Sequence, residues 1–579
     1  MTMPLQPLHL PGREREIADI AAILDASAGG QLRVVILTGE PGIGKSRLLD
    51  EVGSLAAERG FQVIRAACDE ESMPVAFAPL QQIVADLGHT AQRDARTESL
   101  AEHLRRLPRN ATEPELRLAA TDYIARVIRS FVARQPIAVL IDDVQWLDES
   151  SASVLRRLIR TVRYVPATIV VAYRGDDPRV TGAGDRFIAQ VSRDPVCRVM
   201  SLRRLNEDAT RAIVAAYIGT TVGEVARLSD EIQRQSEGVP LYVVELTNHL
   251  QRSGLLVRTE GQWEVEASQL QGIPLNIRAL LDQRLCRLGD EHKRVLEVAA
   301  ALGTEIDART LTDVVRICAP QLAEHVDIAL ERSGELGLLL EDARHEATAW
   351  RFGHQLYRDR LYAGIGHGTR RSIHDAAAEV LDTADGERQV ERVAFHAIRG
   401  RNPLAGIRAA RRAAGAAAAI HAWEDAAQWL DVALDMLAGM PEGDADGPAR
   451  VGECIQLTIE RDSYIAVIGD SAARLASARD LERLVAEAPT ARDRSELLIR
   501  ATRGMVAGGE LDKASSLLAE LVALADADGI EAPVHLWIAI GEAAIGRPIG
   551  EPAPLQCDLD GLHRARAVFR RALSGVPDA

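Results

Sequence analysis

A glycine-rich segment near the start of the chain most constrains its fold. It reads Gly39-Glu40-Pro41-Gly42-Ile43-Gly44-Lys45-Ser46 and fits the phosphate-binding pattern G-x-x-x-x-G-K-[ST]. The apolar, β-branched run 32–38 before it is typical of a buried parallel strand, and residues 47–52 after it follow helical spacing. Because a strand, a glycine loop and a helix are the context that the motif needs, we expect a nucleotide site. The alternative is a glycine turn that binds nothing.

The chemistry of this loop assigns roles to single residues. Glycines let several backbone N–H groups point at one anion, and the helix that follows adds its positive N-terminus. Lys45 should meet the outer phosphates, the Ser46 hydroxyl should ligate Mg²⁺, and Arg47 lies in the first turn of the helix. The loop from Gly39 to Arg47 is therefore the predicted site for ATP or ADP.

Two further strands should end at the same edge of the sheet. Residues 136–143 form an apolar run that ends in Asp142 and Asp143, the Walker B pattern. Asp142 would hold Mg²⁺, and Asp143 would orient or deprotonate the attacking water. The alternative is a strand end followed by a simple turn. Strands that alternate with helices predict a parallel α/β domain.

Arg174 ends the third predicted strand, 167–173. A cation at this position can sense or stabilise a γ-phosphate. The alternative is an ordinary ion pair with a surface carboxylate such as Asp176 or Asp177.

Composition limits the class of protein. A chain of 579 residues predicts about four domains, and its formal net charge of −16 argues against a surface devoted to nucleic acid. The six cysteines are scattered without metal-ligand spacing, so we expect buried free thiols in a reducing compartment. The N-terminus has no secretory pattern and no run of 18 apolar residues occurs, which predicts a cytoplasmic protein without a membrane segment.

Several motifs together resemble a known family. Residues 11–16, the glycine loop and residues 140–151 are similar to the ATPase module of STAND-class signalling proteins, and in particular to the large ATP-binding LuxR-type (MalT-like) regulators. The most specific part is the pattern DD-x-x-W-x-D-x-x-S, with Trp146, Asp148 and Ser151. The resemblance implies ATP or ADP with Mg²⁺, and it places Arg13 in the nucleotide site.

The resemblance continues downstream. Residues 237–246 are similar to the family's G-x-P segment, which implies that Pro240 lies over the adenine, although a helix-initiating proline is an alternative. Residues 350–354 resemble an F-x-H motif, which implies that His354 meets the ADP phosphate and locks a closed state. A histidine that fills the core or caps a helix is an equally good interpretation of His354.

The predicted domains are a P-loop nucleotide domain (1–180), a helical lid (181–280), a winged-helix domain (281–375) and an all-α, tetratricopeptide-like solenoid (376–579). The winged-helix domain should contain helices near 290–301, 308–316 and 320–333, and a hairpin of 337–340 with 348–352. Its third helix carries Glu324, Asp327 and Glu331, which phosphates would repel, so we expect an intramolecular regulator rather than a DNA reader.

The C-terminal part is rich in alanine and in helical patterns, at 405–419, 423–437, 512–521 and 558–573. Stacked helical pairs would build one continuous core and a surface for ligands or proteins. A compact bundle without a binding role is the alternative. We find no helix-turn-helix of the LuxR type before Ala579, so the chain is either a fragment or a member without its own DNA reader.

These features predict an ATP-binding switch with slow hydrolysis and, by resemblance, a transcriptional output. An inducer should bind the helical C-terminal region, the ATP form should self-associate, and DNA contact should need a missing domain or a partner. The alternatives are an AAA+ initiator-like ATPase that binds DNA and a nucleotide-binding scaffold that does not hydrolyse.

Overall fold

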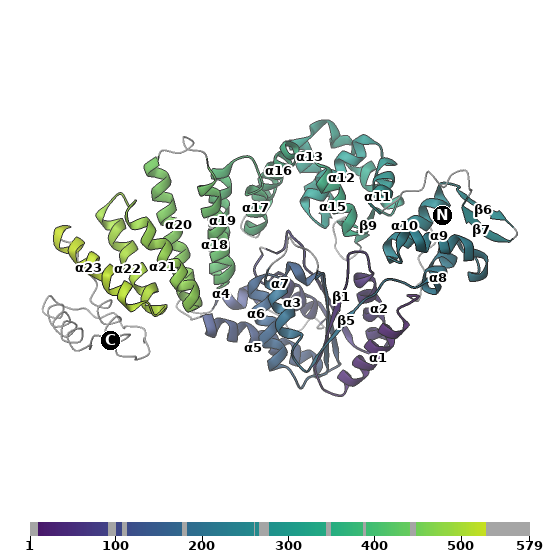
Figure 1. Cartoon of the computed structure of the whole chain (residues 1–579), viewed down its shortest axis with the longest axis horizontal. Helices are drawn as coiled ribbons and strands as arrows, with labels where there is room; N and C mark the ends of the chain where they lie inside the picture. Colours follow the sequence, from purple (N-terminus) through teal and green to yellow (C-terminus); the bar gives the residue numbers. More distant parts are fainter. Residues whose placement is uncertain are drawn as a thin grey trace. The chain divides into compact units, whose positions relative to one another are not determined.

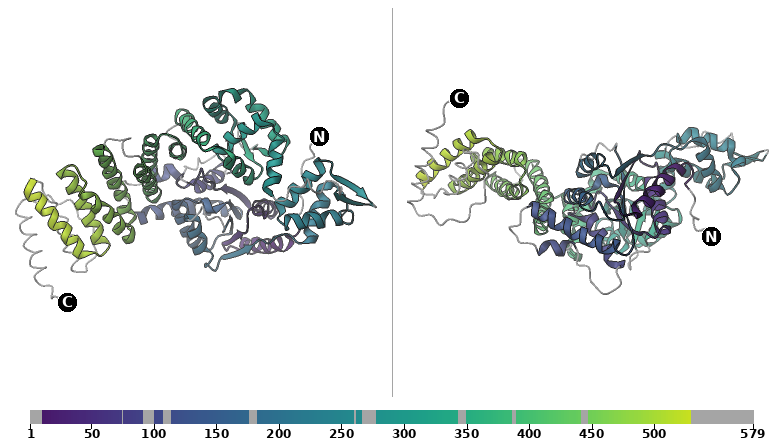
Figure 2. Two further views of the ribbon diagram at one scale, coloured as in Figure 1. Left: turned by 45° about the horizontal axis from the view of Figure 1, so that its top comes forward. Right: turned by 90° about the horizontal axis from the view of Figure 1, so that it is seen from below.

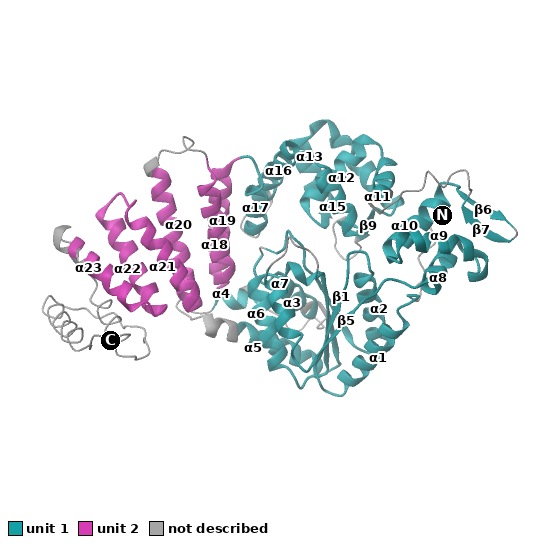
Figure 3. Cartoon of the chain, in the orientation of Figure 1, with its two compact units in different colours: residues 1–107, 117–401 teal, residues 108–116, 402–579 magenta. Residues whose placement is uncertain are grey.

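The computed structural model describes residues 10–73, 75–90, 100–106, 113–175, 182–259, 261–265, 277–342, 349–385, 389–440 and 447–528 (Figure 1). Contacts divide the chain into two compact units (Figure 3). Unit 1 comprises residues 1–107 and 117–401, and unit 2 comprises residues 108–116 and 402–579.

Unit 1 is built on a five-stranded sheet with the order β2-β3-β4-β1-β5. All neighbouring strands are parallel. The strands are β1 (Arg33–Thr38), β2 (Gln62–Ala67), β3 (Ile137–Asp142), β4 (Ala167–Tyr173) and β5 (Cys197–Ser201). The predicted parallel α/β fold is confirmed, and the carboxyl ends of β1, β3 and β4 lie at one edge as expected.

The edge strand β5 lies within residues 181–280, which the sequence predicts as the helical lid. Only Met200 of this strand is buried, so the sequence lacks the continuous apolar run of a central strand. The helix α7 (Ala183–Val191) packs on α6 (Glu149–Thr161) and likewise belongs to the nucleotide domain.

Helices cover both faces of this sheet (Figure 1). One face packs on α1 (Glu14–Ala28) and α2 (Lys45–Glu58) through a buried apolar cluster that includes Leu24, Val35, Leu37 and Leu48. The other helices of the domain are α3 (Ala78–Thr90), α4 (Leu100–Arg105), α5 (Glu113–Val132), the short 3-10 helix η1 (Val144–Trp146) and α6 (Glu149–Thr161).

The lid follows as a small helical cluster with its own core, which includes Val214, Ile232, Val243 and Leu246. Its elements are α8 (Glu207–Ile218), η2 (Val222–Val225), α9 (Ala226–Ser236) and α10 (Pro240–Arg252). An antiparallel hairpin of β6 (Leu256–Thr259) and β7 (Gln262–Val265), which the sequence did not predict, completes it.

The rest of unit 1, residues 277–401, is called here the helix–hairpin module. It contains α11 (Ile277–Cys286), α12 (Asp290–Leu302), β8 (Glu305–Asp307), α13 (Ala308–Cys318), η4 (Pro320–His325), α14 (Val326–Glu335), β9 (Leu339–Asp342), β10 (Ala349–Phe352), α15 (Gln355–Gly364), α16 (His367–Asp385) and α17 (Val390–Ala397). The strands form an antiparallel sheet of order β8-β10-β9. The predicted hairpin pairs as expected, with Leu339 opposite Phe352.

The structure differs from two details of this prediction. The third predicted helix, 320–333, is a 3-10 turn followed by α14. The predicted boundary at residue 376 lies inside α16, because Ala376, Ala377 and Val380 share one buried core with α12 and α13.

Unit 2 is helical, and each of its helices packs on the next in chain order, as both views of Figure 2 show. The helices are α18 (Pro403–Ala419), α19 (Trp423–Ala438), α20 (Gly447–Ile468), α21 (Ser471–Val485), α22 (Ala491–Ala507) and α23 (Leu511–Asp528). The predicted helices in 405–437 and 512–521 are confirmed. The predicted helix 558–573 lies outside the described residues.

Two expected absences concern the described part of the chain alone. There, no helix has the length and apolar character needed to cross a membrane. The cysteines at positions 68, 197, 286, 318 and 454 are free thiols, but the expectation that they are buried holds for Cys68 alone among them, since Cys286 is exposed and the other three are partly exposed. Cys557 lies outside the described residues.

Candidate nucleotide site

The glycine loop connects β1 to α2 at the carboxyl edge of the sheet, and α2 begins at Lys45. The backbone of Gly42 has a φ of 80°, and a Cβ atom added there would lie 3.2 Å from the Leu241 Cβ atom. The Gly39 backbone has a φ of 152°, and its Cβ would lie 3.0 Å from Ile43 Cγ2. Both positions require glycine, because the left-handed backbone and the close neighbours leave no room for a side chain.

Lys45 lies inside the curl of this loop. Its Nζ donates hydrogen bonds to the carbonyl oxygens of Gly39 (2.6 Å) and Glu40 (3.1 Å), and the residue is only 6% exposed. Burial, and then the nearby Arg174 charge, lower the pKa of Lys45 to about 8. A phosphate oxygen near Nζ would favour the charged form, so the ammonium group is well placed to bind an anion.

The predicted magnesium ligands lie together. Asp142 ends β3, and the Ser46 hydroxyl forms a hydrogen bond with its carboxylate. Burial and the neighbouring Asp143 charge raise the pKa of Asp142 to about 6, although the Ser46 hydrogen bond opposes this shift. A hydroxyl and a carboxylate are the oxygen ligands that Mg²⁺ takes from a protein when phosphates and water complete its shell. The residues present therefore fit Mg²⁺.

The two predicted catalytic residues, Asp143 and Arg174, form an ion pair with each other. Arg174 Nε lies 3.0 Å from Asp143 Oδ1, and Arg174 Nη2 lies 3.3 Å from Asp143 Oδ2. Arg174 also donates a hydrogen bond to the Gln355 side chain, which the helix–hairpin module contributes. The alternative partners Asp176 and Asp177 lie outside the described residues.

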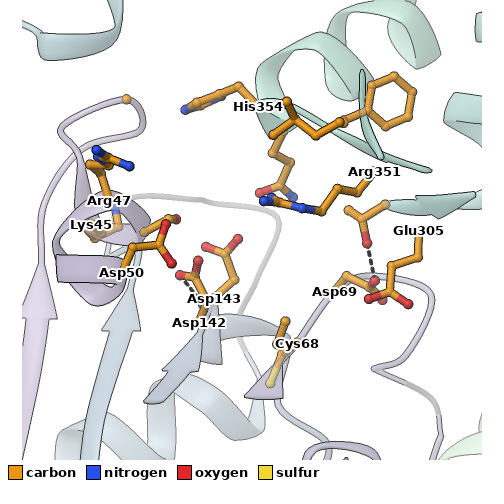
Figure 4. A pocket seen from close by; sticks show the side chains of 18 of the residues that line it. Lys45, Arg47, Asp50, Cys68, Asp69, Asp142, Asp143, Glu305, Arg351 and His354 are labelled. Carbon is orange, nitrogen blue, oxygen red and sulfur yellow. Dashed lines mark hydrogen bonds between the residues drawn. The ribbon is translucent and has the colours of Figure 1, made fainter. Parts of the chain in front are cut away.

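His354 has the capping role that the sequence left open, and its contact with an ADP phosphate stays a prediction. It caps α15, because its Nδ1 accepts a hydrogen bond from the Leu356 N–H at 3.1 Å. Its ring also lines the nucleotide cavity and points across it toward the loop before α2 (Figure 4). Burial, with a contribution from the Arg174 charge, lowers the pKa of His354 to about 4. The neutral ring therefore carries its proton on Nε2, where it can donate to a ligand.

The lid contacts the loop directly through the G-x-P segment. Pro240 is the first residue of α10, and the next N–H, from Leu241, donates to the Gly42 carbonyl oxygen (3.2 Å). The position of Pro240 suits helix initiation, and it also lines the cavity. Its contact with adenine stays a prediction.

Arg13 and Glu40 have protein partners beside the loop. The buried Arg13 guanidinium donates to the carbonyl oxygens of Ile43 (3.1 Å) and Arg203 (2.7 Å), so it holds the loop in place. The Glu40 carboxylate binds Arg204 at 2.6 and 2.9 Å, and this hydrogen bonding lowers the pKa of Glu40. Direct contact of either side chain with nucleotide stays a prediction.

The specific pattern around Asp148 has a structural explanation. The buried Asp148 carboxylate caps α6 by accepting the Ser151 N–H at 2.7 Å, and it also accepts the Phe77 N–H at 3.0 Å. It therefore joins the segment after β3 to the segment after β2. Burial raises the pKa of this carboxyl to about 6, although both backbone contacts oppose the shift.

A cavity of about 1030 Å³ has walls from three parts of unit 1, and its lining includes Arg13, residues 42–47, Asp142, Asp143, Arg174, Pro240 and His354. Gly39, Glu40 and Asp148 are not part of this lining. Sequence reasoning missed several residues that line it, namely Cys68, Asp69, Glu71, Tyr217, Glu305, Arg351 and Gln355. Arg351 lies on β10, and Figure 4 shows its side chain extending into the cavity. These residues are spread over loops, the strands β8 and β10 and the helices α8 and α15, and no motif assigns any of them to a nucleotide site.

Comparison with known proteins agrees with this geometry. Residues 9–171 match the family model described as an AAA ATPase domain. The nucleotide domain is an AAA-type ATPase domain. An uncharacterised protein of Rhizobium meliloti is 25% identical over 496 residues, which is 79% of this chain and 45% of that protein. The chain therefore spans less than half the length of this relative.

Solved structures were also similar to the chain. One is a STAND protein with a tetratricopeptide repeat sensor from Pyrococcus horikoshii, with a TM-score of 0.41, 13% identity and coverage of 99% of this chain and 84% of that chain. Another is the Drosophila ORC bound to DNA, with a TM-score of 0.31, 13% identity and coverage of 62% and 88%. A third is AMPPCP-bound DnaA from Aquifex aeolicus, with a TM-score of 0.29, 16% identity and coverage of 57% and 93%.

Proposed function

We propose that this protein is an ATP- and ADP-dependent signalling switch of the STAND type that hydrolyses ATP slowly. One observation carries the proposal. The helix–hairpin module reaches into the nucleotide site, where Gln355 binds Arg174 and Arg174 binds Asp143. A module that contacts the groups around the γ-phosphate position can respond to the presence of that phosphate.

Nucleotide binding would use the glycine loop. Its N–H groups, the start of α2 and Lys45 would hold the phosphates, while Ser46 and Asp142 would hold Mg²⁺. Bound Mg²⁺ would neutralise phosphate charge. The base would lie beside Pro240, where the lid meets the loop. Arg351 could add a contact to the outer phosphate from the opposite wall.

Slow hydrolysis follows from the ion pair at the site. Asp143 is the candidate to orient the attacking water, and its carboxylate is bound to Arg174. Gln355 holds Arg174 in this position. Withdrawal of the module would remove the Gln355 contact and let Arg174 turn toward a γ-phosphate, which would free Asp143.

The output would be regulatory rather than metabolic. The module would act as a winged-helix regulator within the chain, since α14 carries Asp327 and Glu331, which disfavour contact with DNA phosphates. We infer a relation to LuxR-type transcriptional regulators, with an inducer bound to the helices of unit 2 and self-association in the ATP form. DNA would then be contacted through another domain or a partner, in the cytoplasm.

The energy that such a switch needs is moderate. Moving an equilibrium from 1:99 to 99:1 requires a difference of about 5.5 kcal/mol in affinity between two states. Hydrogen bonds to charged groups contribute about 1.5–3 kcal/mol each, so a few contacts to the γ-phosphate suffice.

The variant Asp143→Asn tests this function. Mg-ATP binding should be retained, and turnover should fall at least about tenfold because a water-orienting carboxylate is lost. Unchanged turnover would favour a scaffold that does not hydrolyse. Salt-sensitive binding of duplex DNA by the full chain would favour the initiator-like alternative instead.

A further inference from the structure

A second charged contact joins the nucleotide domain to the helix–hairpin module at the wall of the same cavity, which Asp69, Glu71 and Arg392 also line. An acidic loop, Asp69-Glu70-Glu71, follows β2. It lies against a basic socket that consists of Arg358, Arg392, His396 and Arg399. Glu71 Oε1 lies 2.6 Å from Arg392, and Glu70 lies 3.4 Å from Arg399 and 3.7 Å from Arg358.

The acidic loop is closely fitted into the module. The Glu71 side chain is 8% exposed, and a Cβ atom added to Gly303 would lie 2.0 Å from Glu71 Oε2. Gly303 ends α12, and the next residue, Thr304, donates a hydrogen bond to Asp69. A side chain at position 303 would displace the Glu71 carboxylate from its present place, and the φ of 128° at Gly303 also favours glycine.

A chain of hydrogen bonds orients the socket toward the loop. The Tyr362 hydroxyl lies 2.9 Å from His374 Nε2, and His374 Nδ1 lies 2.8 Å from His396 Nδ1. His396 Nε2 then lies 3.6 Å from Glu71 Oε1. With both rings neutral, His374 Nδ1 donates to His396 Nδ1, and the His396 Nε2–H faces Glu71 at a distance too long for a hydrogen bond.

The charges of these groups agree with that arrangement. Burial lowers the pKa of both histidines, so they stay neutral near pH 7. Burial alone would raise the pKa of Glu71, but His396 and Arg392 hold it below its ordinary value. Glu71 is therefore an ionised carboxylate in a site built to receive it.

The acidic loop is also tied to the magnesium ligand. Ala67 pairs with Asp142 in the sheet, and the Cys68 N–H donates to the Asp142 carbonyl oxygen at 3.0 Å. Figure 4 places Cys68 and Asp69 at the edge of the cavity that holds Asp142. On the other side, Arg392 and His396 lie on α17, the last helix of unit 1, and the chain enters unit 2 at residue 402.

We propose that the acidic loop and the basic socket form a clasp that holds the nucleotide cavity closed and sets the rate of ADP release. Opening would return Glu71 and Arg392 to water, where each is well solvated. Removing Arg392 leaves the Glu71 carboxylate buried without its cation in the closed state only, and removing Glu71 takes away an ion pair that only the closed state contains, so either change favours opening. A signal from unit 2 would act through α17. This inference rests on the proposed function, and it makes Glu71 and Arg392 positioning residues rather than catalytic ones.

The test uses the full chain and a fluorescent ADP analogue, whose release is followed by stopped flow after mixing with excess ADP. Glu71→Gln and Arg392→Gln should each release the analogue about tenfold faster, a size typical of coupling between two sites. In the double variant, the increase in release rate should be smaller than the product of the two single increases, because both changes remove the same interaction. Hydrogen exchange should rise in residues 68–73 and in α17 of each variant.

A matched control separates the clasp from a general loss of stability. Asp282→Asn breaks a bidentate ion pair with Arg360 (2.6 and 2.7 Å) that lies wholly within the module, and it should leave ADP release unchanged. Normal ADP release in both Glu71→Gln and Arg392→Gln, at normal affinity, would overturn the clasp. Absence of nucleotide binding in the unmodified protein would instead overturn the proposed function. If Glu71→Gln fails to fold, the release rate of Arg392→Gln tests the clasp by itself. Arg392 is 35% exposed, so its replacement should be tolerated by the fold.

Discussion

The two walls of the nucleotide cavity are built in different ways. The wall at the glycine loop consists of backbone groups and of Lys45 and Ser46, all within a few residues of one another. The opposite wall consists of side chains such as Arg351, His354 and Gln355, which lie some 300 residues further along the chain. Local groups can form a site that binds phosphate, whereas distant groups can report whether the parts of the protein are together. The comparison suggests that binding belongs to the first wall and regulation to the second.

The largest effect should come from the first wall. Lys45→Ala removes a buried cation that, among the residues the structure describes, donates hydrogen bonds to the Gly39 and Glu40 carbonyls. We therefore expect Mg-ADP to bind at least about 100-fold more weakly. Isothermal titration calorimetry measures this. Lys513→Ala breaks an ion pair with Glu482 in unit 2 and should leave the affinity unchanged. Tight binding by Lys45→Ala would show that the loop wall is not the binding wall.

A change in the opposite wall should alter the lifetime of the complex rather than abolish it. Gln355→Ala removes the hydrogen bond to Arg174, and we expect about tenfold faster ADP release with nucleotide still bound. Steady-state ATP turnover should rise in the same variant, since Arg174 no longer has a partner in the module. A loss of binding as large as that of Lys45→Ala would remove the distinction between the walls.

His354 offers a finer separation, between capping and ligand contact. His354→Ala should lower stability by about 1 kcal/mol because the cap of α15 is lost, whereas His354→Asn keeps a capping side chain and should be close to neutral. Thermal unfolding measures this difference. If the ring also contacts phosphate, both variants should bind ADP more weakly than the unmodified protein. Equal affinity in all three proteins would leave capping as the function of His354.

The smallest effect concerns pH and the magnesium ligands. The raised pKa of Asp142, about 6, means that half of this carboxyl is protonated near pH 6 and that nearly all of it is ionised at pH 7.5. Because Mg²⁺ needs the ionised form, magnesium-dependent ADP affinity should fall about twofold between pH 7.5 and 6 and continue to fall below that. Titrations with and without EDTA separate this effect from others. If ADP affinity changes by the same factor between pH 7.5 and 6 without Mg²⁺, the pH dependence belongs to a group other than Asp142.

The sequence predicted the groups of the first wall well. The apolar runs that end in Asp142 and Arg174 indicated two strands, and the parallel sheet brings their ends beside the glycine loop. It also placed Pro240 and His354 near the cavity through the resemblance of short motifs. The sequence did not predict the edge strand β5, because only Met200 in this strand is buried and the strand lacks a continuous apolar run. The sequence also did not predict that unit 1 ends at residue 401, because the expected boundary at residue 376 lies inside α16.

The sequence by itself determined that this chain has a phosphate-binding loop, two acidic groups at a strand end and a helical C-terminal part. These features depend on local spacing and on the periodicity of apolar residues, which a sequence displays directly. Only the tertiary structure decided that Asp143 pairs with Arg174, that Gln355 reaches this pair, and that Glu71 fits between Gly303 and Arg392. Such contacts join segments far apart in the chain, and charged residues at those positions look like any solvated residue until the fold brings them together.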